Sequence, residues 1–431
     1  MTTPERGAFA RTLRNVGWLL GGKGVGAVLS LIYLALATRS LGVERFGQFM
    51  LILSTAQAIA ALVTFQSWQL IIRFGVAPLQ RGDRGALGRL VGFCVALDLG
   101  AALAGCGLAA GAVAVMARYF GWSPDLARDA LVFAVVLLVT VRSTAVGVLR
   151  LHDRFRTGAA ADAVTPIMRF AGALAVVASE ASVRGFLLAW AVAEVATAMA
   201  YWRLAVRDGS GVAWTWRGIA AVPREQPGLW HFALVTNLNA TLQSASKQVI
   251  VVIVGFVSGA GAAGAYRLAF QLSQSLARLS DMFSRAVFPE FTRAHASDGD
   301  ALRQLFRQST RLTLAVGSGV CVLAPVLSEP VMRIAGGSHY AGAATLLMLL
   351  SVAAALDLMG TGFEPVLLGT GRTGAALRIR LASVAVLGIA AVVLMPGMGA
   401  TGAAAATLIA SALTLAMAAW TAHQAVRAGR N

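Results

Sequence analysis

Charged side chains are scarce in this chain of 431 residues. They make up 13% of it, whereas a typical soluble domain carries about a quarter. Acidic residues are the scarcest, at 19 against 36 basic ones, while apolar residues account for 58%. A chain so poor in charge is solvated by lipid rather than by water over most of its length, which excludes an ordinary water-soluble fold.

Cysteine and histidine are also rare. The three cysteines, Cys94, Cys106 and Cys321, all lie in apolar runs, and the five histidines are dispersed along the chain. This pattern is typical of small core residues rather than of a disulfide framework or a metal centre. We therefore expect no metal site and no cofactor.

Long apolar runs are abundant instead. A membrane-spanning helix needs about 20 mostly apolar residues. About a dozen runs come close to this length, near residues 16–38, 46–72, 90–116, 130–149, 159–178, 185–202, 230–257, 262–288, 310–332, 341–364, 381–395 and 401–422. The sequence predicts an all-α membrane protein with about 12 transmembrane helices.

Arginines crowd into alternate gaps between these runs. Arg81, Arg84 and Arg89 follow the second run, for example, whereas the gap after the third holds few basic residues. Basic loops stay in the cytoplasm, so the alternation predicts that the N- and C-termini are both cytoplasmic. Because the positive charge is distributed in this way, it argues against a nucleic-acid partner.

The longest gap lies near the middle of the chain and contains Pro223 and Pro227. It predicts an N-terminal six-helix lobe at 1–206, a cytoplasmic linker at 207–229 and a C-terminal six-helix lobe at 230–431. A short repeat supports this division, because segments 42–49 and 259–266 both read G-x-x-x-x-G-x-aromatic at the same place in each half. Internal repeats of this kind are common in transporters.

Lys23 lies in a segment, Gly-Trp-Leu-Leu-Gly-Gly-Lys-Gly, that fits all but the last position of a phosphate-binding loop. That loop requires a Ser or Thr after the lysine, and it joins a strand to a helix. Here Gly24 takes the last position and apolar, helix-like sequence lies on both sides. Lys23 is therefore a charge inside a membrane helix, which either extends to the inner surface or faces the protein interior.

Polar side chains also line two later runs. In the eighth run they follow one helix face, at spacings of three and four residues: Arg267, Gln271, Gln274, Arg278 and Asp281. The seventh run carries Asn237, Gln243 and Lys247. A charge that faces lipid costs about 2.5–3.5 kcal/mol, so these cations are expected to face a central, water-filled, cationic cavity. The alternative is a packed core in which Asp281 and the amides neutralise them.

Such a cavity suits an anion, phosphate above all, because guanidinium and ammonium groups bind phosphate oxygens well. A lipid with a phosphorylated head group fits this chemistry. Segment 37–49, Ala-Thr-Arg-Ser-Leu-Gly-Val-Glu-Arg-Phe-Gly-Gln-Phe, also resembles the signature after the first helix of the bacterial polysaccharide flippases. These are the lipid-linked oligosaccharide transporters of the multidrug/oligosaccharidyl-lipid/polysaccharide exporter superfamily. Further pieces of the family pattern follow in order at 264–269, 287–291, 340–344, 368–372 and 399–404.

The resemblance implies two six-helix lobes around a central cavity that opens alternately to each side of the bacterial cell (inner) membrane. It implies a transporter, not an enzyme, whose substrate is an oligosaccharide on a polyprenyl diphosphate. The substrate would move from the cytoplasmic to the outer leaflet for synthesis of O-antigen, capsule or exopolysaccharide. A polysaccharide polymerase and chain-length components are candidate partners, together with the lipid bilayer.

The resemblance also suggests roles for individual residues. Lys23, Lys247, Arg267 and Arg278 are the positions that could bind the diphosphate, and Asn237, Gln243, Gln271 and Gln274 could meet sugar hydroxyls. Relatives often carry an acid in helix seven where this chain has Ser246, so that acid's ion-coupling role cannot be transferred. The remaining candidates for ion coupling are Asp98, Glu194, Asp281 and Asp357, each of which could equally be the buried partner of an arginine.

Two other functions remain open at this point. A multidrug-type, cation-coupled antiporter would share the fold, but it would favour an acidic cavity. A membrane glycosyltransferase or ligase could use the pair Asp298 and Asp300, which forms a D-x-D pattern. That pair stands in a short loop without a catalytic domain, so capping or solubility is the simpler interpretation.

Overall fold

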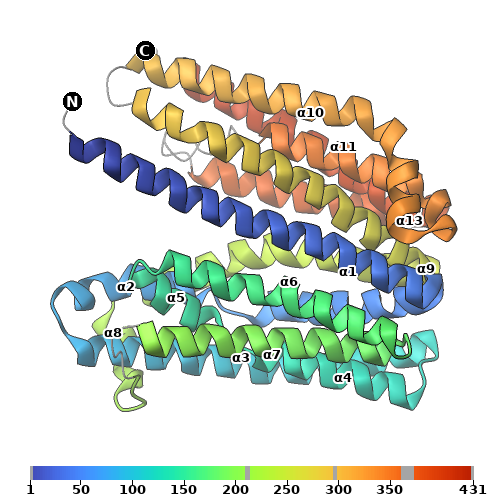
Figure 1. Ribbon diagram of the computed structural model, residues 1–431, viewed down its shortest axis with the longest axis horizontal. Helices are drawn as coiled ribbons and strands as arrows, with labels where there is room; N and C mark the ends of the chain where they lie inside the picture. The colour runs from blue at the N-terminus through green and yellow to red at the C-terminus, as the bar shows by residue number, and fades with distance from the viewer. Residues whose placement is uncertain (1–2, 209–213, 295–298, 361–372, 429–431) are drawn as a thin grey trace. The chain divides into compact units, whose positions relative to one another are not determined.

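The structure is a computed structural model that describes residues 3–208, 214–294, 299–360 and 373–428. Side chains are described at 26–207, 214–242, 244–275, 311, 313–360 and 378–421. Every regular element in the described ranges is a helix, as Figure 1 shows, and this confirms the all-α prediction.

The helices fall into two compact units. Unit 1 consists of Met1–Leu41 and Phe49–Val249, and unit 2 of Gly42–Gln48 and Ile250–Asn431. Unit 1 contains most of α1 (Thr3–Val63), the start of α9 (Leu229–Ala294) and the elements between them: α2 (Ser67–Gln80), α3 (Arg84–Phe120), α4 (Pro124–Val139), α5 (Ser143–Leu151), α6 (Phe155–Ala178), α7 (Val183–Asp208), the 3₁₀ helix η1 (Ile219–Ala221) and α8 (Val222–Glu225). Unit 2 contains the rest of α9, with α10 (Gly299–Gly336), η2 (Ser338–Ala343), α11 (Ala344–Gly360) and α13 (Thr373–Ala428).

Nine helical stretches in the described part of the chain are long and apolar enough to cross a membrane. Three of them, Gly26–Gln80, Leu229–Ser275 and Arg378–Thr421, are 44 to 55 residues long, about twice what one crossing needs. Each of the three contains one glycine with a non-helical backbone: Gly42, Gly259 or Gly399. In α13 the chain doubles back at this point, because Gly402 lies against the carbonyl group of Leu394.

The repeated motif adopts the same backbone conformation in both of its copies. Gly42 has φ 73° and ψ 179°, and Gly259 has φ 86° and ψ 170°. Only glycine adopts this region of conformational space routinely. The first glycine of the motif is therefore required by the bend that follows the first and the seventh predicted spans.

The second glycine of each motif lies where the two copies cross within unit 2. A Cβ atom added to Gly47 would lie 2.1 Å from the carbonyl oxygen of Ala260, and one added to Gly264 would lie 2.8 Å from the Cα atom of Gly47. Next to this crossing, Phe46 is fully buried and packs edge-on against Tyr340. The repeat therefore marks a backbone-to-backbone contact between its own two copies.

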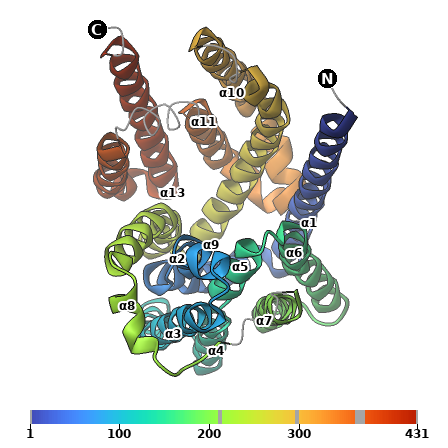
Figure 2. The same ribbon diagram turned by 90° about the vertical axis from the view of Figure 1, so that its left-hand side faces the viewer.

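The core of unit 1 lies among its packed helices. Helices α2, α3 and α5 pack together, as the view along the helices in Figure 2 shows, and α6 packs against α7. Aromatic rings fill the space around α7, where Phe49, Phe186 and Tyr33 all pack against the buried Trp190.

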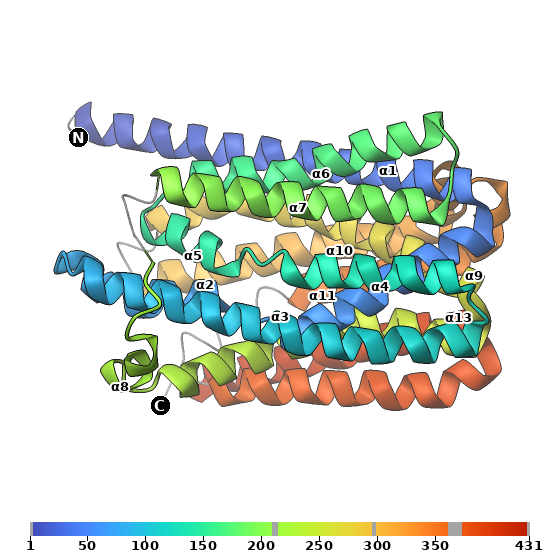
Figure 3. The same ribbon diagram turned by 90° about the horizontal axis from the view of Figure 1, so that it is seen from below.

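Two of the predicted spans are interrupted inside unit 1. The run 46–72 is broken at residues 64–66, between α1 and α2, and the run 130–149 is broken at residues 140–142, between α4 and α5. Figure 3 shows the non-helical stretch between α4 and α5. Apolar periodicity does not reveal either break, and both breaks contribute to the candidate site.

Substitution of the two motif glycines should destabilise the protein to different extents. Gly42→Ala should cost about 1–3 kcal/mol because of its backbone conformation. Gly47→Ala should cost more, since a methyl group there overlaps the Ala260 carbonyl. Thermal unfolding of the purified full-length protein in detergent measures both effects. Gly107→Ala is the matched control, because a Cβ atom there has open space. Equal melting temperatures for Gly47→Ala and Gly107→Ala would rule out the close crossing.

Candidate functional site

Arg142 lies in the interruption between α4 and α5. Thr140 follows α4, and its hydroxyl group donates to the carbonyl oxygens of Val136 and Leu137, at 2.8 and 3.1 Å. The indole N–H of Trp202 donates to the Val141 carbonyl at 2.8 Å. Side chains thus satisfy backbone groups that the break leaves unpaired, which is the condition for irregular backbone at membrane depth. Arg142 follows as the residue that precedes α5.

The interruption between α1 and α2 is stabilised in the same way. Thr241 of α9 donates its hydroxyl hydrogen bond to the Ala61 carbonyl at 2.9 Å. Ser143, the first residue of α5, donates to the Phe65 carbonyl and accepts from the backbone N–H of Trp68, both at 3.3 Å. The two interruptions are therefore hydrogen-bonded to each other through Ser143.

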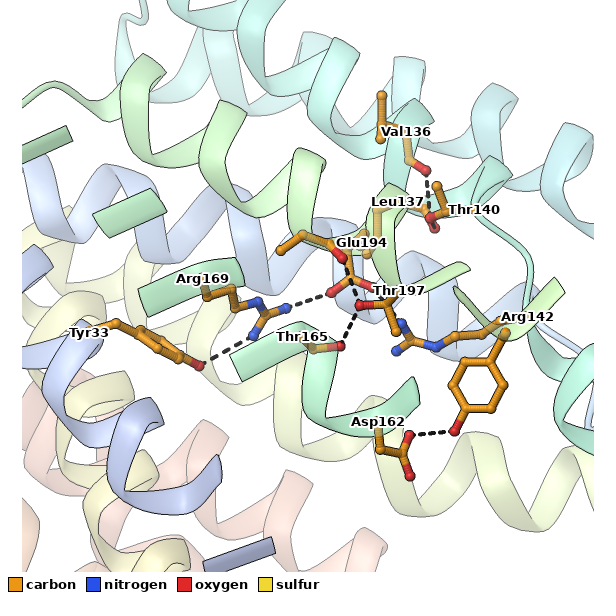
Figure 4. Close-up of polar contacts among 12 residues, drawn as sticks. Tyr33, Val136, Leu137, Thr140, Arg142, Asp162, Thr165, Arg169, Glu194 and Thr197 are labelled. Carbon is orange, nitrogen blue, oxygen red and sulfur yellow. Dashed lines mark hydrogen bonds and ion pairs between the residues drawn. The ribbon is translucent and has the colours of Figure 1, made fainter. Parts of the chain in front are cut away.

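Two arginines bind one buried glutamate next to these breaks. Nη1 of Arg142 lies 3.0 Å from Oε2 of Glu194, and Nη2 of Arg169 lies 2.6 Å from Oε1, as Figure 4 shows. Arg142 immediately precedes α5, whereas Arg169 and Glu194 come from α6 and α7. Their exposed fractions are 7% for Glu194, 16% for Arg169 and 38% for Arg142. Two guanidinium groups and one carboxylate leave the cluster with a net charge of +1.

Arg169 has binding capacity beyond its ion pair. Its guanidinium group lies over the Trp190 indole, 5.4 Å from the ring centroid, and its Nη1 lies 3.4 Å from the Tyr33 hydroxyl oxygen. Its Nε–H is buried and has no acceptor among the described residues. An unpaired buried donor is unfavourable, and an anion bound beside it would relieve that cost.

Further polar contacts extend along the seam between α6 and α7. The hydroxyl groups of Thr165 and Thr197 lie 2.8 Å apart, and Tyr201 donates to the Asp162 carboxylate at 2.6 Å. Both contacts lie on the same side of Glu194, toward the start of α6, as Figure 4 shows. We call Arg142, Arg169 and Glu194 the Arg–Glu–Arg cluster. Because it combines excess positive charge with neighbouring hydroxyl groups, it can bind a phosphorylated or carboxylated ligand.

Four of the residues singled out from the sequence lie in unit 1. Glu194 is the centre of the Arg–Glu–Arg cluster, and Asp98 is buried on α3, where it accepts hydrogen bonds from Ser67 and Thr144. Asn237 is half-buried on α9, and its Oδ1 is buried without a hydrogen-bond partner among the described groups. Lys247 is exposed on the same helix.

Four others lie in unit 2. Arg267 is buried on α9, with 8% of its surface exposed, and Gln271 and Gln274 follow it half-buried along the same helix. Asp357 is exposed on α11. The side chains of Lys23, Gln243, Arg278 and Asp281 lie outside the described ranges. The roles of all these residues stay predictions.

Arg142 and Arg169 were not among the site residues predicted from the sequence. Arg142 falls inside the predicted run 130–149, and the structure gives it a buried partner inside unit 1. Arg169 carried a usable signal, because it stands in the middle of the fifth run while Glu194 stands in the middle of the sixth. Opposite charges inside two consecutive spans are expected to pair.

The Arg–Glu–Arg cluster makes a testable contribution to stability. Glu194→Gln leaves two partly buried cations without an anion and should destabilise the protein by about 3–5 kcal/mol. Adding Arg169→Gln removes one of these cations and should restore part of the loss. Thermal unfolding of the four proteins of this double-mutant cycle measures the coupling. Arg128→Gln, in an exposed pair with Asp125, is the control and should change stability by less than about 1 kcal/mol. A Glu194→Gln effect as small as the control would contradict the assignment.

Known proteins with the same fold are membrane transporters and flippases, not enzymes. A structure of the lipid II flippase MurJ in an inward closed conformation covers 94% of this chain and 87% of its own, with a TM-score of 0.70 and 11% identity. The match to an inward-facing multidrug resistance MATE family transporter of the MOP superfamily covers 93% of this chain and 95% of the transporter. Its TM-score is 0.69 and the sequence identity is 14%. Likeness at this level of identity establishes a shared fold.

Sequence comparison goes further than the fold. The chain is 26% identical over 342 residues to the inner membrane protein YghQ of Escherichia coli (strain K12), which covers 78% of this chain and 95% of that protein. The family described as polysaccharide biosynthesis protein matches residues 12–295, more than half of the chain. The resemblance to polysaccharide flippases is therefore confirmed at the level of the family. The chain is a multi-pass membrane protein that belongs to the polysaccharide biosynthesis protein family.

Proposed function

We propose that this protein is a flippase of the bacterial inner membrane that moves a polyprenyl-diphosphate-linked oligosaccharide from the cytoplasmic to the outer leaflet. The moved unit would supply the synthesis of O-antigen, capsule or exopolysaccharide. The observation that carries the proposal is the Arg–Glu–Arg cluster, in which two arginines share one carboxylate among apolar helices. Membership of a polysaccharide biosynthesis family and the fold shared with a lipid II flippase support it.

A diphosphate suits the chemistry of the cluster. Guanidinium groups bind phosphate oxygens through charge-assisted, often bidentate hydrogen bonds, and they keep their charge at every physiological pH. Arg142 is more than one-third exposed, so part of its guanidinium group remains available while Glu194 orients it. The buried Nε–H of Arg169 supplies one more donor for an oxygen of the head group.

We propose that further polar residues complete the site. Lys23, Lys247, Arg267 and Arg278 would bind the diphosphate, and Asn237, Gln243, Gln271 and Gln274 would meet sugar hydroxyls. Asn237 has an unpaired buried amide oxygen, which suits this role. Asp98, Glu194, Asp281 and Asp357 remain the candidates for ion coupling, although the two arginines on Glu194 favour a structural role for that acid.

We further propose 12 membrane crossings in two six-helix lobes, at 1–206 and 230–431, joined by a cytoplasmic linker at 207–229 around a central cavity. Nine apolar stretches support this number, because three of them are long enough to cross twice and bend at Gly42, Gly259 and Gly399. An even number of crossings would put both termini on the same side of the membrane, and the arginine-rich gaps of the sequence favour the cytoplasmic side. Alternating access by the two lobes would then expose the site to each side in turn.

A multidrug-type antiporter is the competing function, since a MATE family transporter has nearly the same structural similarity to this chain. Cationic drugs favour an acidic site, whereas the Arg–Glu–Arg cluster has a net charge of +1. The balance of charge therefore favours an anionic substrate.

Substitution of the cluster arginines tests the proposed function. The purified full-length protein should bind a fluorescently labelled polyprenyl diphosphate, and Arg142→Ala or Arg169→Ala should weaken this binding on the order of tenfold to a hundredfold, because each removes charge-assisted hydrogen bonds. Arg128→Ala, which removes an exposed arginine of α4, is the matched control and should bind as the unmodified protein does. Binding that is equal in all four proteins, or a preference for a lipophilic cation, would contradict the proposal.

Reporter fusions test the proposed arrangement in the membrane. A fluorescent protein fused after Asn431 should fluoresce in bacterial cells, and alkaline phosphatase fused at the same position should be inactive, because the C-terminus lies in the cytoplasm. Active alkaline phosphatase at this position would require an odd number of crossings or an inverted topology.

A further inference from the structure

Asp98 joins the two half-helices that begin after the interruptions of unit 1. Only 2% of its surface is exposed. Its Oδ1 accepts a hydrogen bond from the Ser67 hydroxyl at 2.5 Å, and its Oδ2 accepts one from the Thr144 hydroxyl at 2.7 Å. The backbone N–H of Thr144 also donates to the carboxylate. Ser67 is the first residue of α2, and Thr144 is the second residue of α5.

Burial makes an ionised carboxylate costly at this position, and two helix N-termini offset part of that cost. The N-terminal turn of a helix carries partial positive charge and unpaired N–H groups, so it stabilises an anion. Helices α2 and α5 are 14 and nine residues long, and both begin at the same carboxylate. All three hydrogen bonds place a donor opposite an Asp98 oxygen, so the arrangement uses the ionised form as an acceptor only.

Protonation would weaken this junction. A neutral carboxylic acid has lost the charge that strengthens the three hydrogen bonds, and a serine or threonine hydroxyl would have to rotate from donor to acceptor to meet its proton. The first turns of α2 and α5 would then lose their common partner. Thr144 is two residues beyond Arg142, so a movement of the first turn of α5 would also move Arg142 relative to Glu194.

The charged groups of the surrounding elements are bound elsewhere or exposed. Cys94 is the titratable neighbour on α3 itself. The ionisable groups on α2, α4, α5 and α8 are Arg73, Asp125, Arg128, Asp129, Arg150, Arg224 and Glu225, and η1 has none. Arg73 and Arg150 lie over the rings of Phe232 and Trp68. Arg128, Asp129 and Glu225 form ion pairs with Asp125, Arg184 and Arg89, and Arg224 is exposed. No cation in the described part of the chain pairs with Asp98.

We infer that Asp98 is a proton-binding latch that positions Arg142. In its ionised form it holds the first turns of α2 and α5 together and keeps Arg142 against Glu194. When it takes up a proton from water, the junction opens and the Arg–Glu–Arg cluster loses its fixed geometry. This inference rests on the proposed function in one respect: if the cluster binds a lipid diphosphate, the proton is the ion that couples to its release.

Hydrogen exchange at the two interruptions tests the latch. Exchange of the full-length protein in nanodiscs is followed by mass spectrometry at neutral and at acid pH, and it is expressed as protection after correction for the pH dependence of the chemical exchange rate. In the unmodified protein, protection of peptides that cover 64–66 and 140–142 should fall on the order of tenfold on acidification, since charge-assisted hydrogen bonds are about twice as strong as neutral ones. Asp98→Asn should be weakly protected at both pH values.

Matched variants separate the latch from a general loss of structure. Asp129→Asn removes another carboxylate of unit 1 and should keep the pH dependence of the unmodified protein. If Asp98→Asn fails to fold, Thr144→Val serves instead, because it leaves the carboxylate but removes one hydroxyl donor, and it should lower protection at neutral pH. Protection that does not change with pH in the unmodified protein, or that changes equally in Asp98→Asn, would overturn the inference.

A second measurement detects the proton itself. Infrared difference spectra on acidification should contain the carbonyl band of a protonated carboxylic acid that is lost in Asp98→Asn and kept in Asp129→Asn. Absence of an Asp98-dependent band would also overturn the latch. Binding of labelled polyprenyl diphosphate is measured separately. Its absence at every pH would refute the proposed function, while the exchange and infrared results would still decide whether Asp98 is a latch.

Discussion

Glu194 accepts hydrogen bonds from arginines on two other helices, and this shared carboxylate holds the interior of unit 1 in place. Each arginine alone would be expensive to bury among apolar helices, and the glutamate alone would be as well. Together they form a cluster with one excess positive charge, whose geometry is fixed by α5, α6 and α7. The excess charge gives the cluster its affinity for anions, and the shared carboxylate gives it rigidity. Stability and binding therefore depend on the same three side chains.

The interrupted helices explain how this cluster can exist inside a membrane. Broken spans release backbone N–H and C=O groups, which hydrocarbon cannot satisfy. In unit 1, carbonyl groups at the breaks accept hydrogen bonds from the hydroxyl groups of Thr241 and Ser143 and from the indole N–H of Trp202. Asp98 completes the arrangement by binding the first turns of both half-helices. Placing Arg142 beside Glu194 thus depends on a set of buried polar contacts outside the cluster itself.

Much of the fold could be predicted from the sequence because it follows from composition and from glycine. The scarcity of charge predicted helices in a membrane, and the bends at Gly42 and Gly259 lie in gaps between the predicted runs. The interruptions could not be predicted, because the contacts that allow them join residues 78 and 180 positions apart. For the same reason the sequence could not show that the run 130–149 is broken at Arg142. Glu194 was found as a buried acid, but the sequence could not decide which arginines it would meet.

Seven residues from the first part of the chain, Gly42–Gln48, belong to unit 2, and the start of α9 belongs to unit 1. Phe46, which is fully buried, therefore belongs to the core of a unit whose second segment begins at Ile250, more than 200 positions later. A chain divided in the middle would leave each half without a piece of its own interior. Each unit takes a segment from the other half of the sequence, so recombination between relatives at the central linker would combine core residues from different proteins within one unit.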